Sequence, residues 1–498
     1  MTNTNHNFAL VLDAMCERHP ARLALFSRYG TLRYGELARL IEAHAAALAA
    51  SGAGPGRCVA LLLPNSPAFV AAFFGALRLG ASVAPIGILL KPREVGQRLA
   101  LVDAAVLVTT AARAGELAEA EIEMLVVDAS GDGLASRGRA PVASRAEDDT
   151  AVLVLTSGTT GAPKAAEISH AGLAWNGRAL VDGFALTAAD VQLAAAPLSH
   201  VLGMSGVMNA TLVTGGALAL IERFDAADAL SAIAQTGTTG VMGAPAMFAA
   251  LVREARKTTI GAPPLRFAHT GGAPLPGELA RAIAETFGCV AREGYGMSEV
   301  GGGITLAPLW REAKPGSVGQ AFPGSSLRIV DTDTGVPLAA GERGEVQVRS
   351  PSVMRGYRGD EVATRAVLDP DRWLYTGDVG YLDADGDLFL VDRKKDIIIR
   401  SGYNVYPREV EAVILTCPGV LDVAVMGLPD DERGEEVVAL VVPARDDLNP
   451  EAVKAFARER LAAYKYPRHV VMVKDLARGP TGKIAKHEID VAALIARP

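Results

Sequence analysis

The segment from Thr156 to Lys164 carries the most distinctive chemistry in the sequence. It reads Thr-Ser-Gly-Thr-Thr-Gly-Ala-Pro-Lys and directly follows an apolar run at 151–155. The glycines let backbone N–H groups turn toward one point, the hydroxyls add donors, and Lys164 adds a positive charge. We therefore expect a polyphosphate to be bound by Thr156, Ser157, Gly158, Thr159, Thr160, Gly161 and Lys164.

This loop does not have the spacing of a Walker A loop. A Walker A loop needs four residues between its glycines and a Ser or Thr after its lysine. Here two residues separate Gly158 from Gly161, and Ala165 follows the lysine. The spacing therefore disfavours a P-loop NTPase.

A second string, Gly-Tyr-Gly-Met-Ser-Glu at 294–299, places a carboxylate beside a hydroxyl and an aromatic ring. Oxygen ligands suit Mg²⁺, a hard ion that bridges phosphates. An aromatic face suits adenine. The string is weak evidence alone and stronger in series with the loop at 156–164.

Taken in order, these motifs resemble the adenylate-forming superfamily, which includes acyl-CoA synthetases, peptide-synthetase adenylation domains and firefly-type luciferases. The superfamily carries a TSGTTGxPK loop, and this chain matches every fixed position. The resemblance extends from about Tyr34 to about Lys486, nearly the whole chain. It implies ATP, Mg²⁺ and CoA as ligands.

The resemblance also implies roles for single residues of the second string. Tyr295 would pack on the adenine, with Gly296 beside it. Ser298, where Thr is usual, would contact the α-phosphate. Glu299 would bind Mg²⁺.

Further nucleotide contacts are implied on both sides of that string. Gly272 and Ala273 would line the adenine pocket through their backbone, which glycine allows a ligand to approach closely. Asp378, in Trp-Leu-Tyr-Thr-Gly-Asp, and Arg393 would bind the ribose. His200, in Pro-Leu-Ser-His, would orient the carboxylate or gate CoA entry.

Three residues near the C-terminus complete the set that the resemblance implies. Lys395 would be a hinge, and Gly402 would let pantetheine pass close to the backbone. Lys483, in Gly-Pro-Thr-Gly-Lys, would be catalytic. An ammonium touching both anions would offset a repulsion of roughly 4 kcal/mol between carboxylate and α-phosphate at about 4 Å.

The elements around these motifs predict an α/β protein. Short apolar runs alternate with helical segments before and after the phosphate loop, as in layered parallel sheets. We expect a large N-terminal domain of layered α/β subdomains plus a distorted β region, and a small mobile α+β C-terminal domain. The expected bounds are 1–392 for the N-terminal domain, 393–396 for the hinge and 397–498 for the lid.

Composition limits the partners. The chain has 498 residues and a net charge of −7, which argues against a nucleic-acid footprint. Its four cysteines lie far apart, so no metal or disulfide pattern is present. A signal-peptide core and a transmembrane stretch are both missing from the sequence. We expect a soluble cytoplasmic protein that could form a homodimer.

The sequence favours an ATP-dependent acyl-CoA synthetase that forms acyl-AMP and then transfers the acyl group to CoA. The segment 201–206 carries no charge, which disfavours an amino acid as substrate. A hydrophobic acid fits: a medium- or long-chain fatty acid first, an aryl or polycyclic acid second. An acyl-AMP ligase that loads a carrier protein and a non-catalytic acyl-adenylate-binding protein are the alternatives.

Overall fold

The computed structural model describes residues 5–134, 141–156, 163–257, 262–430, 432–445, 447–478 and 484–495. The chain divides into two compact units, each described here by itself. Unit 1 comprises residues 1–326 and 348–374, and unit 2 comprises residues 327–347 and 375–498. In unit 1 and unit 2 alike, no described helix is both long and apolar enough to span a bilayer.

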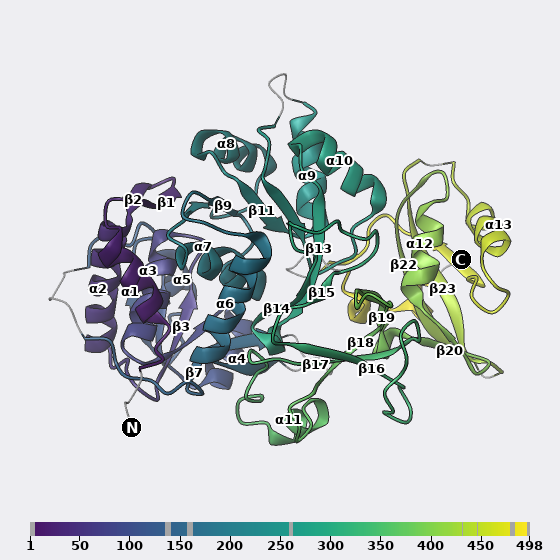
Figure 1. The fold of residues 1–498 in the computed structure, drawn as a ribbon. Helices are drawn as coiled ribbons and strands as arrows, with labels where there is room; N and C mark the ends of the chain where they lie inside the picture. Colours follow the sequence, from purple (N-terminus) through teal and green to yellow (C-terminus); the bar gives the residue numbers. More distant parts are fainter. Residues whose placement is uncertain are drawn as a thin grey trace. The chain divides into compact units, whose positions relative to one another are not determined.

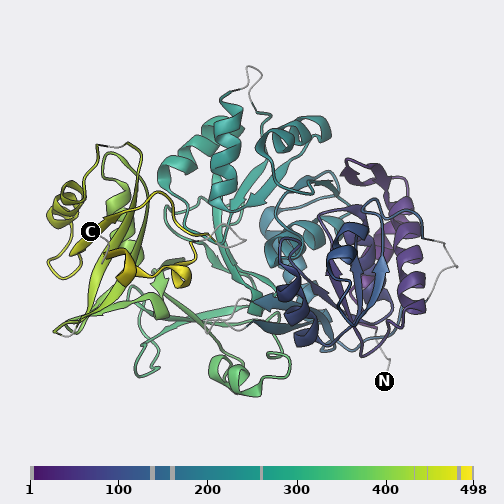
Figure 2. The same ribbon diagram turned by 180° about the vertical axis from the view of Figure 1, so that it is seen from behind.

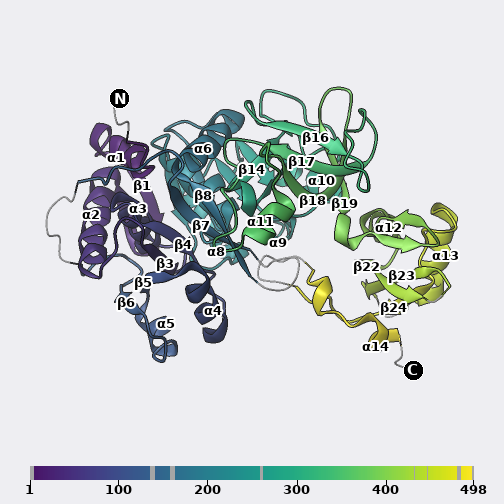
Figure 3. The ribbon, with the colours of Figure 1, turned by 90° about the horizontal axis from the view of Figure 1, so that it is seen from below.

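Unit 1 contains a six-stranded sheet among its described residues, in the order β6-β5-β3-β4-β7-β8 (Figure 3). The pairs are parallel except for β7 with β8, which is antiparallel. The strands are β3 Cys58–Leu62, β4 Ser82–Pro85, β5 Ala104–Thr109, β6 Glu123–Val126, β7 Thr150–Thr156 and β8 Lys164–Ser169.

A nine-stranded sheet of unit 1 has the order β15-β14-β13-β12-β11-β9-β10-β1-β2 in the described part of the chain. It is parallel from β13 to β1, with antiparallel pairs at both ends. The strands are β1 Leu23–Ser27, β2 Gly30–Arg33, β9 Val191–Ala194, β10 Ala217–Leu220, β11 Gly240–Gly243, β12 Phe267–Thr270, β13 Ala291–Met297, β14 Gly302–Leu306 and β15 Gln320–Ala321.

Unit 1 also contains helices, which are labelled in Figure 1. They are α1 Ala9–Arg18, α2 Tyr34–Ala50, α3 Pro67–Arg78, α4 Pro92–Val102, α5 Ala111–Glu116, α6 His170–Phe184, α7 Ala210–Leu212, α8 Ala226–Thr236, α9 Pro245–Ala255, α10 Gly277–Phe287 and α11 Glu361–Val367, with a π-helix η1 at Leu202–Asn209 and a 3₁₀ turn η2 at Ser298–Val300. Helix α3 is apolar on every side up to its last residue, Arg78, and all its residues are buried, as such a helix must be. Ser66 caps it by accepting from the Phe69 N–H.

Helices α8 to α10 pack on one face of the nine-stranded sheet, and the same helices are seen from behind in Figure 2. Phe248, Leu251 and Phe287 meet Val241 and Ala268 there. The apolar runs of the sequence thus form a buried core, and the loops at the strand ends are left for ligands.

Unit 2 holds most of a four-stranded sheet, β16-β17-β18-β19, and a second sheet in which β21-β20-β23-β22 are neighbours and β24 also pairs with β23. The strands are β16 Ser326–Val330, β17 Gly344–Arg349, β18 Leu374–Leu382, β19 Leu388–Arg393, β20 Ile398–Arg400, β21 Tyr403–Val405, β22 Val420–Asp430, β23 Gly434–Pro443 and β24 His469–Met472. The helices are α12 Pro407–Leu415, α13 Pro450–Arg460 and α14 Val491–Ile495, with short turns η3 Lys394–Asp396 and η4 Lys486–Glu488.

The expected α/β class is confirmed, with a large N-terminal part and an α+β C-terminal part. The division by contacts falls after Leu374, ahead of the charged stretch at 393–396, since β18 and β19 pair with each other. The domain bounds taken from the sequence stay predictions.

Candidate active site

The phosphate loop connects two neighbouring strands of unit 1. Thr156, the last residue of β7, lies opposite Lys164, the first residue of β8. Strand β7 also pairs in parallel with β4, as its apolar sequence predicts. Ser157, Gly158, Thr159, Thr160 and Gly161 lie outside the described residues, so their phosphate contacts stay predictions.

Lys164 and Glu299 both contact the side chain of Tyr357. The Lys164 Nζ lies 4.9 Å from the centroid of the Tyr357 ring. The Tyr357 hydroxyl donates to Glu299 Oε1 at 2.8 Å. All three side chains are half-buried. The structure therefore brings together a cation and a carboxylate that the sequence places 135 positions apart (299 minus 164).

The residues 354–358, here called the edge segment, run beside β8. The Arg358 N–H donates to the Ala165 carbonyl at 2.9 Å, and the Glu167 N–H donates to the Gly356 carbonyl at 2.9 Å. A strand at the edge of a sheet has unpaired backbone groups, and the edge segment satisfies those of β8. The Met354 N–H also donates to the Glu299 carbonyl at 2.8 Å.

Burial raises the pKa of the Tyr357 phenol above its ordinary value, and the charge of Glu299 and the hydrogen bond to it raise that pKa further. A negative charge beside a phenol disfavours the phenolate. Tyr357 therefore stays protonated and acts as a donor toward Glu299. No role for Tyr357 was expected from the sequence, because a Gly-Tyr-Arg-Gly stretch has the composition of an ordinary turn.

The residues expected around the adenine lie at the β13–β14 hairpin. Tyr295 is almost entirely buried, and its N–H donates to Thr305 Oγ1 at 3.3 Å. Gly296 is required here, because a Cβ on it would lie 2.3 Å from the Gly302 carbonyl oxygen. Ser298 and Glu299 follow on η2. Strand β13 thus presents Tyr295, and the short helix η2 that follows it presents Ser298 and Glu299.

Gly272 and Ala273 follow the carboxyl end of β12 and are exposed. Gly272 has a φ of +83°, a conformation that favours glycine. The turn is held from β13, where Glu293 Oε1 accepts from the Leu275 N–H at 2.9 Å. Burial raises the pKa of Glu293.

His200 lies in a segment that Asn65 fixes. The Asn65 amide donates to the carbonyls of Ala194 at 2.9 Å and Ala196 at 3.0 Å, and its oxygen accepts from the Leu198 N–H at 2.8 Å. Asn65 belongs to the turn after β3, so it ties one sheet of unit 1 to the other. The Pro-Asn-Ser-Pro sequence is typical of a turn, and a turn sequence carries no signal for this long-range contact.

After His200 the chain enters η1, a π-helix at Leu202–Asn209. π-helical turns are rare and are frequent at functional sites. Gly203 lets this helix approach the preceding segment, because a Cβ there would lie 2.2 Å from the Pro197 carbonyl oxygen. Met204, Val207 and Met208 are buried, so the expected acyl-pocket segment is apolar in the structure too.

In unit 2, Asp378 and Arg393 lie directly opposite each other on β18 and β19. The Arg393 Nε donates to Asp378 Oδ1 at 3.2 Å. The next residue back, Asp392, is buried and accepts from the Arg393 and Arg408 N–H groups at 2.8 Å each. Burial raises the pKa of Asp392. The two expected ribose ligands thus form one pair on one hairpin.

Gly402 lies at the tip of the β20–β21 hairpin, where Arg400 pairs with Tyr403. Ser401 and Gly402 have φ of 53° and 80°, as a two-residue hairpin turn requires. A Cβ on Gly402 would meet no atom within 4 Å, so the turn explains this glycine without any crowding. Lys395, the expected hinge residue, is exposed on η3.

Lys483 lies outside the described residues. The residues on either side of its loop are described: Arg478 and Ile484 form an antiparallel bridge, and the Ala485 N–H donates to the Ala477 carbonyl at 2.7 Å. Lys486 is anchored to Glu411 at 2.8 Å. The catalytic role of Lys483 stays a prediction.

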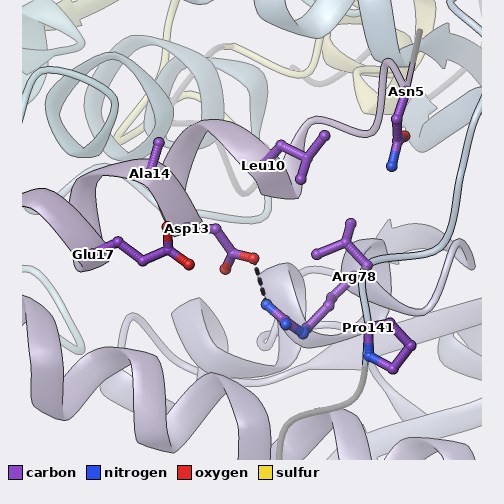
Figure 4. A pocket seen from close by; sticks show the side chains of 8 residues that line it. Asn5, Leu10, Asp13, Ala14, Glu17, Arg78 and Pro141 are labelled. Atoms are coloured by element: carbon purple, nitrogen blue, oxygen red, sulfur yellow. Dashed lines mark hydrogen bonds and ion pairs between the residues drawn. The ribbon is translucent and has the colours of Figure 1, made fainter.

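A hollow of about 570 Å³ on unit 1 is lined by residues without expected chemistry (Figure 4). Its lining residues are Asn5, Leu10, Asp13, Ala14, Glu17, Arg78, Pro141 and Val142. Asp13 and Arg78 pair with each other across it.

Two family profiles match the chain. The AMP-binding enzyme profile matches residues 12–358, and the profile of the AMP-binding enzyme C-terminal domain matches residues 409–483. A feruloyl-CoA synthase of Amycolatopsis sp is 36% identical over 480 residues, which cover 94% of this chain and 97% of that protein.

Solved structures agree with this assignment. ATP-bound MatB from Rhodopseudomonas palustris superposes with a TM-score of 0.90 at 29% identity, covering 97% of this chain and 98% of that one. The o-succinylbenzoate coenzyme A synthetase MenE from Bacillus subtilis, in complex with ATP and magnesium ion, superposes with a TM-score of 0.87 at 29% identity, covering 96% and 98%. The resemblance drawn from the motifs is thereby confirmed, and the chain belongs to the adenylate-forming family of AMP-binding enzymes.

Proposed function

We propose that this protein is an ATP-dependent CoA ligase that activates an aromatic carboxylic acid. The observation that carries the proposal is that Tyr357 contacts both Lys164 and Glu299 beside the phosphate loop. A cation and a hard-metal ligand held together suit the phosphates of MgATP. The aromatic substrate is favoured by the names of two relatives, a feruloyl-CoA synthase and an o-succinylbenzoate CoA synthetase.

The residues of unit 1 fit a nucleotide and its metal. Within the described residues, Lys164 forms no ion pair, so its charge is available to phosphate oxygens. Glu299 Oε1 accepts a hydrogen bond from Tyr357, and within the described residues Glu299 Oε2 makes none. Mg²⁺ held by Glu299 would supply charge neutralisation at the phosphates.

In the first step a carboxylate oxygen of the acid would attack the α-phosphorus of ATP. The bond from that phosphorus to the bridging oxygen breaks, pyrophosphate leaves with the electron pair, and acyl-AMP forms. His200 would orient the carboxylate, and Lys483 would neutralise the two anions as they meet. In the second step the CoA sulfur would attack the acyl carbon, AMP would leave, and the thiol proton would pass to solvent.

The sequence favoured a medium- or long-chain fatty acid, partly because the chain has few aromatic residues. The relatives named above do not support that preference, and a fatty acid becomes the alternative substrate. The η1 segment is apolar and uncharged, which suits either class. A cytoplasmic location, a homodimer and a hinge at Lys395 stay predictions.

An acid panel tests the proposal. The purified protein would be incubated with ATP, Mg²⁺ and ferulate, benzoate, decanoate or palmitate, with and without CoA, while pyrophosphate, AMP and thioester are measured. We expect thioester and AMP from an aromatic acid.

Each of the other outcomes would indicate a different function. Turnover of decanoate or palmitate alone would favour the fatty-acid ligase. Acid-dependent pyrophosphate without thioester would indicate an acyl-AMP ligase. No acid-dependent pyrophosphate would indicate a binding protein.

A further inference from the structure

Tyr357 contacts two of the residues of unit 1 to which the motifs assign ATP chemistry, Lys164 and Glu299, although it belongs to neither motif. Its hydroxyl lies 2.8 Å from Glu299 Oε1, and its ring centroid lies 4.9 Å from Lys164 Nζ. One side chain thus makes a polar contact through its end and a cation–π contact through its face.

The backbone of Tyr357 is fixed from several directions. Tyr357 bridges to Ala166 of β8, two residues after Lys164. Its N–H donates to Thr364 Oγ1 at 2.8 Å, and that hydroxyl in turn donates to the Asp360 carbonyl at 2.7 Å. At the other end of the edge segment, the Met354 N–H holds the Glu299 carbonyl. The edge segment is therefore attached both to the strand of Lys164 and to the turn of Glu299.

This attachment has a chemical consequence for the carboxylate. A hydroxyl that occupies Oε1 fixes the rotation of the Glu299 carboxylate and leaves Oε2 as its second acceptor. Donors behind a metal ligand orient it, and their removal commonly costs about 10- to 100-fold in metal affinity. The ring face meanwhile attracts the Lys164 ammonium, so it restricts where that charge can lie.

We propose that Tyr357 is a positioning residue for MgATP, which sets the carboxylate of Glu299 for the metal through its hydroxyl and the ammonium of Lys164 for the phosphates through its ring. This inference rests on the proposed function, because it requires that Glu299 and Lys164 bind MgATP. It adds a role for a side chain outside the motifs, and it separates the contributions of hydroxyl and ring.

The two contributions can be measured apart in binding experiments without acid or CoA. Calorimetry would follow ATP binding at increasing Mg²⁺ concentration in wild type, Tyr357→Phe and Tyr357→Leu. Tyr29→Phe is a matched control, because the Tyr29 hydroxyl also donates to a carboxylate, that of Glu222, in the same unit.

We expect Tyr357→Phe to raise the Mg²⁺ concentration for half-maximal binding about tenfold, since it loses the hydroxyl alone. Tyr357→Leu should show the same shift and also weaker ATP binding at saturating Mg²⁺, because the ring is gone. Tyr29→Phe should bind as wild type does.

An unshifted Mg²⁺ dependence in Tyr357→Phe, with ATP still bound, would overturn the inference and leave the proposed function intact. An equal shift in Tyr29→Phe would overturn it as well. If wild type binds no MgATP, the proposed function fails and the inference fails with it. Should Tyr357→Leu not fold, Tyr357→Phe decides.

Discussion

The two units place their site residues in different ways. In unit 1, Lys164, Glu299 and Tyr357 come from three distant parts of the chain and meet through a side-chain hydrogen bond and a cation–π contact. In unit 2, Asp378 and Arg393 face each other across one hairpin, and Gly402 lies at the tip of another. Unit 1 therefore depends on long-range packing, and unit 2 depends on local turn geometry.

The difference suits the chemistry that we propose for each unit. Polyphosphate and metal require charges fixed before the ligand arrives, because fixed charges cost no reorganisation during reaction. The hairpins of unit 2 are more exposed, and the side chain of Arg393 is 42% accessible. Substitutions that remove buried contacts in each unit can test this difference.

The largest effect of a single substitution on stability is expected in unit 2, where Glu436 is buried among arginines. Its side chain is 2% exposed, and it pairs at 2.9 Å with Arg400, which precedes the Gly402 turn. Glu436→Gln should lower the free energy of unfolding by about 3–5 kcal/mol, because it leaves a buried guanidinium uncompensated. Hydrogen exchange across β20–β23 would measure this. Asp447→Ala, at an exposed pair with Arg445, is the control and should cost about 0–1 kcal/mol.

Acid should destabilise unit 1 through its buried histidines. Burial lowers the pKa of His170 to about 4 and that of His269 to about 4. Unfolded histidine titrates near 6.5, so below that pH the unfolded chain binds protons that the folded chain does not. The stabilisation from each neutral histidine is complete above about pH 6.5 and is lost as pH falls toward 4, by roughly 3 kcal/mol.

Tryptophan fluorescence can follow this loss, because the three tryptophans, at 175, 310 and 373, all belong to unit 1. His170 Nδ1 accepts from the Phe8 N–H at 3.1 Å, and Asn can supply a similar acceptor. His170→Asn should flatten the pH dependence only in part, since His269 and the buried His44, whose pKa burial also lowers, remain. His19→Asn, at an exposed position, should leave it unchanged. A pH dependence that His170→Asn does not alter would contradict this account.

A smaller effect is expected at Asn65. Asn65→Ala leaves the buried Leu198 N–H without its acceptor and should lower the free energy of unfolding by about 1–3 kcal/mol. It should also raise KM for the acid, because the segment of His200 loses its support. Asn65→Asp keeps the acceptor but turns a buried carboxylate oxygen toward the carbonyls of Ala194 and Ala196, so it should cost at least as much. A wild-type free energy of unfolding in Asn65→Asp would contradict the role given to the donated hydrogen bonds.

The smallest effect is expected when an exposed arginine of the edge segment is replaced. Arg355 and Arg358 each lie 3.8 Å from Glu167, and the side chain of Arg355 is 48% exposed. Arg355→Ala should change the free energy of unfolding by about 0–1 kcal/mol and leave the Mg²⁺ dependence of ATP binding unchanged. A shift in that dependence would mean that charge, rather than Tyr357, positions the site.

Local features of the fold could be predicted from the sequence, and the long-range contacts of unit 1 could not. The apolar run at 151–155 predicted a buried strand and lies in β7, because an apolar run acts over a few positions. The roles of Asp378 and Gly402 came from the resemblance to the adenylate-forming superfamily and stay predictions. The pairing of the edge segment with β8 was not predictable, because it joins residues far apart and Gly-Tyr-Arg-Gly carries no strand pattern. The three-point contact of Asn65 was missed for the same reason.

Lys483, for which we propose the catalytic role, tests the central claim most directly. Lys483→Ala would be assayed for acid-dependent adenylate formation and, separately, for thioester formation from preformed acyl-AMP and CoA, with the exposed Lys474→Ala as control. We predict that adenylate formation falls about 100- to 1,000-fold while thioester formation from acyl-AMP stays near the wild-type rate. Adenylate formation at the wild-type rate, or an equal fall in both steps, would contradict the account.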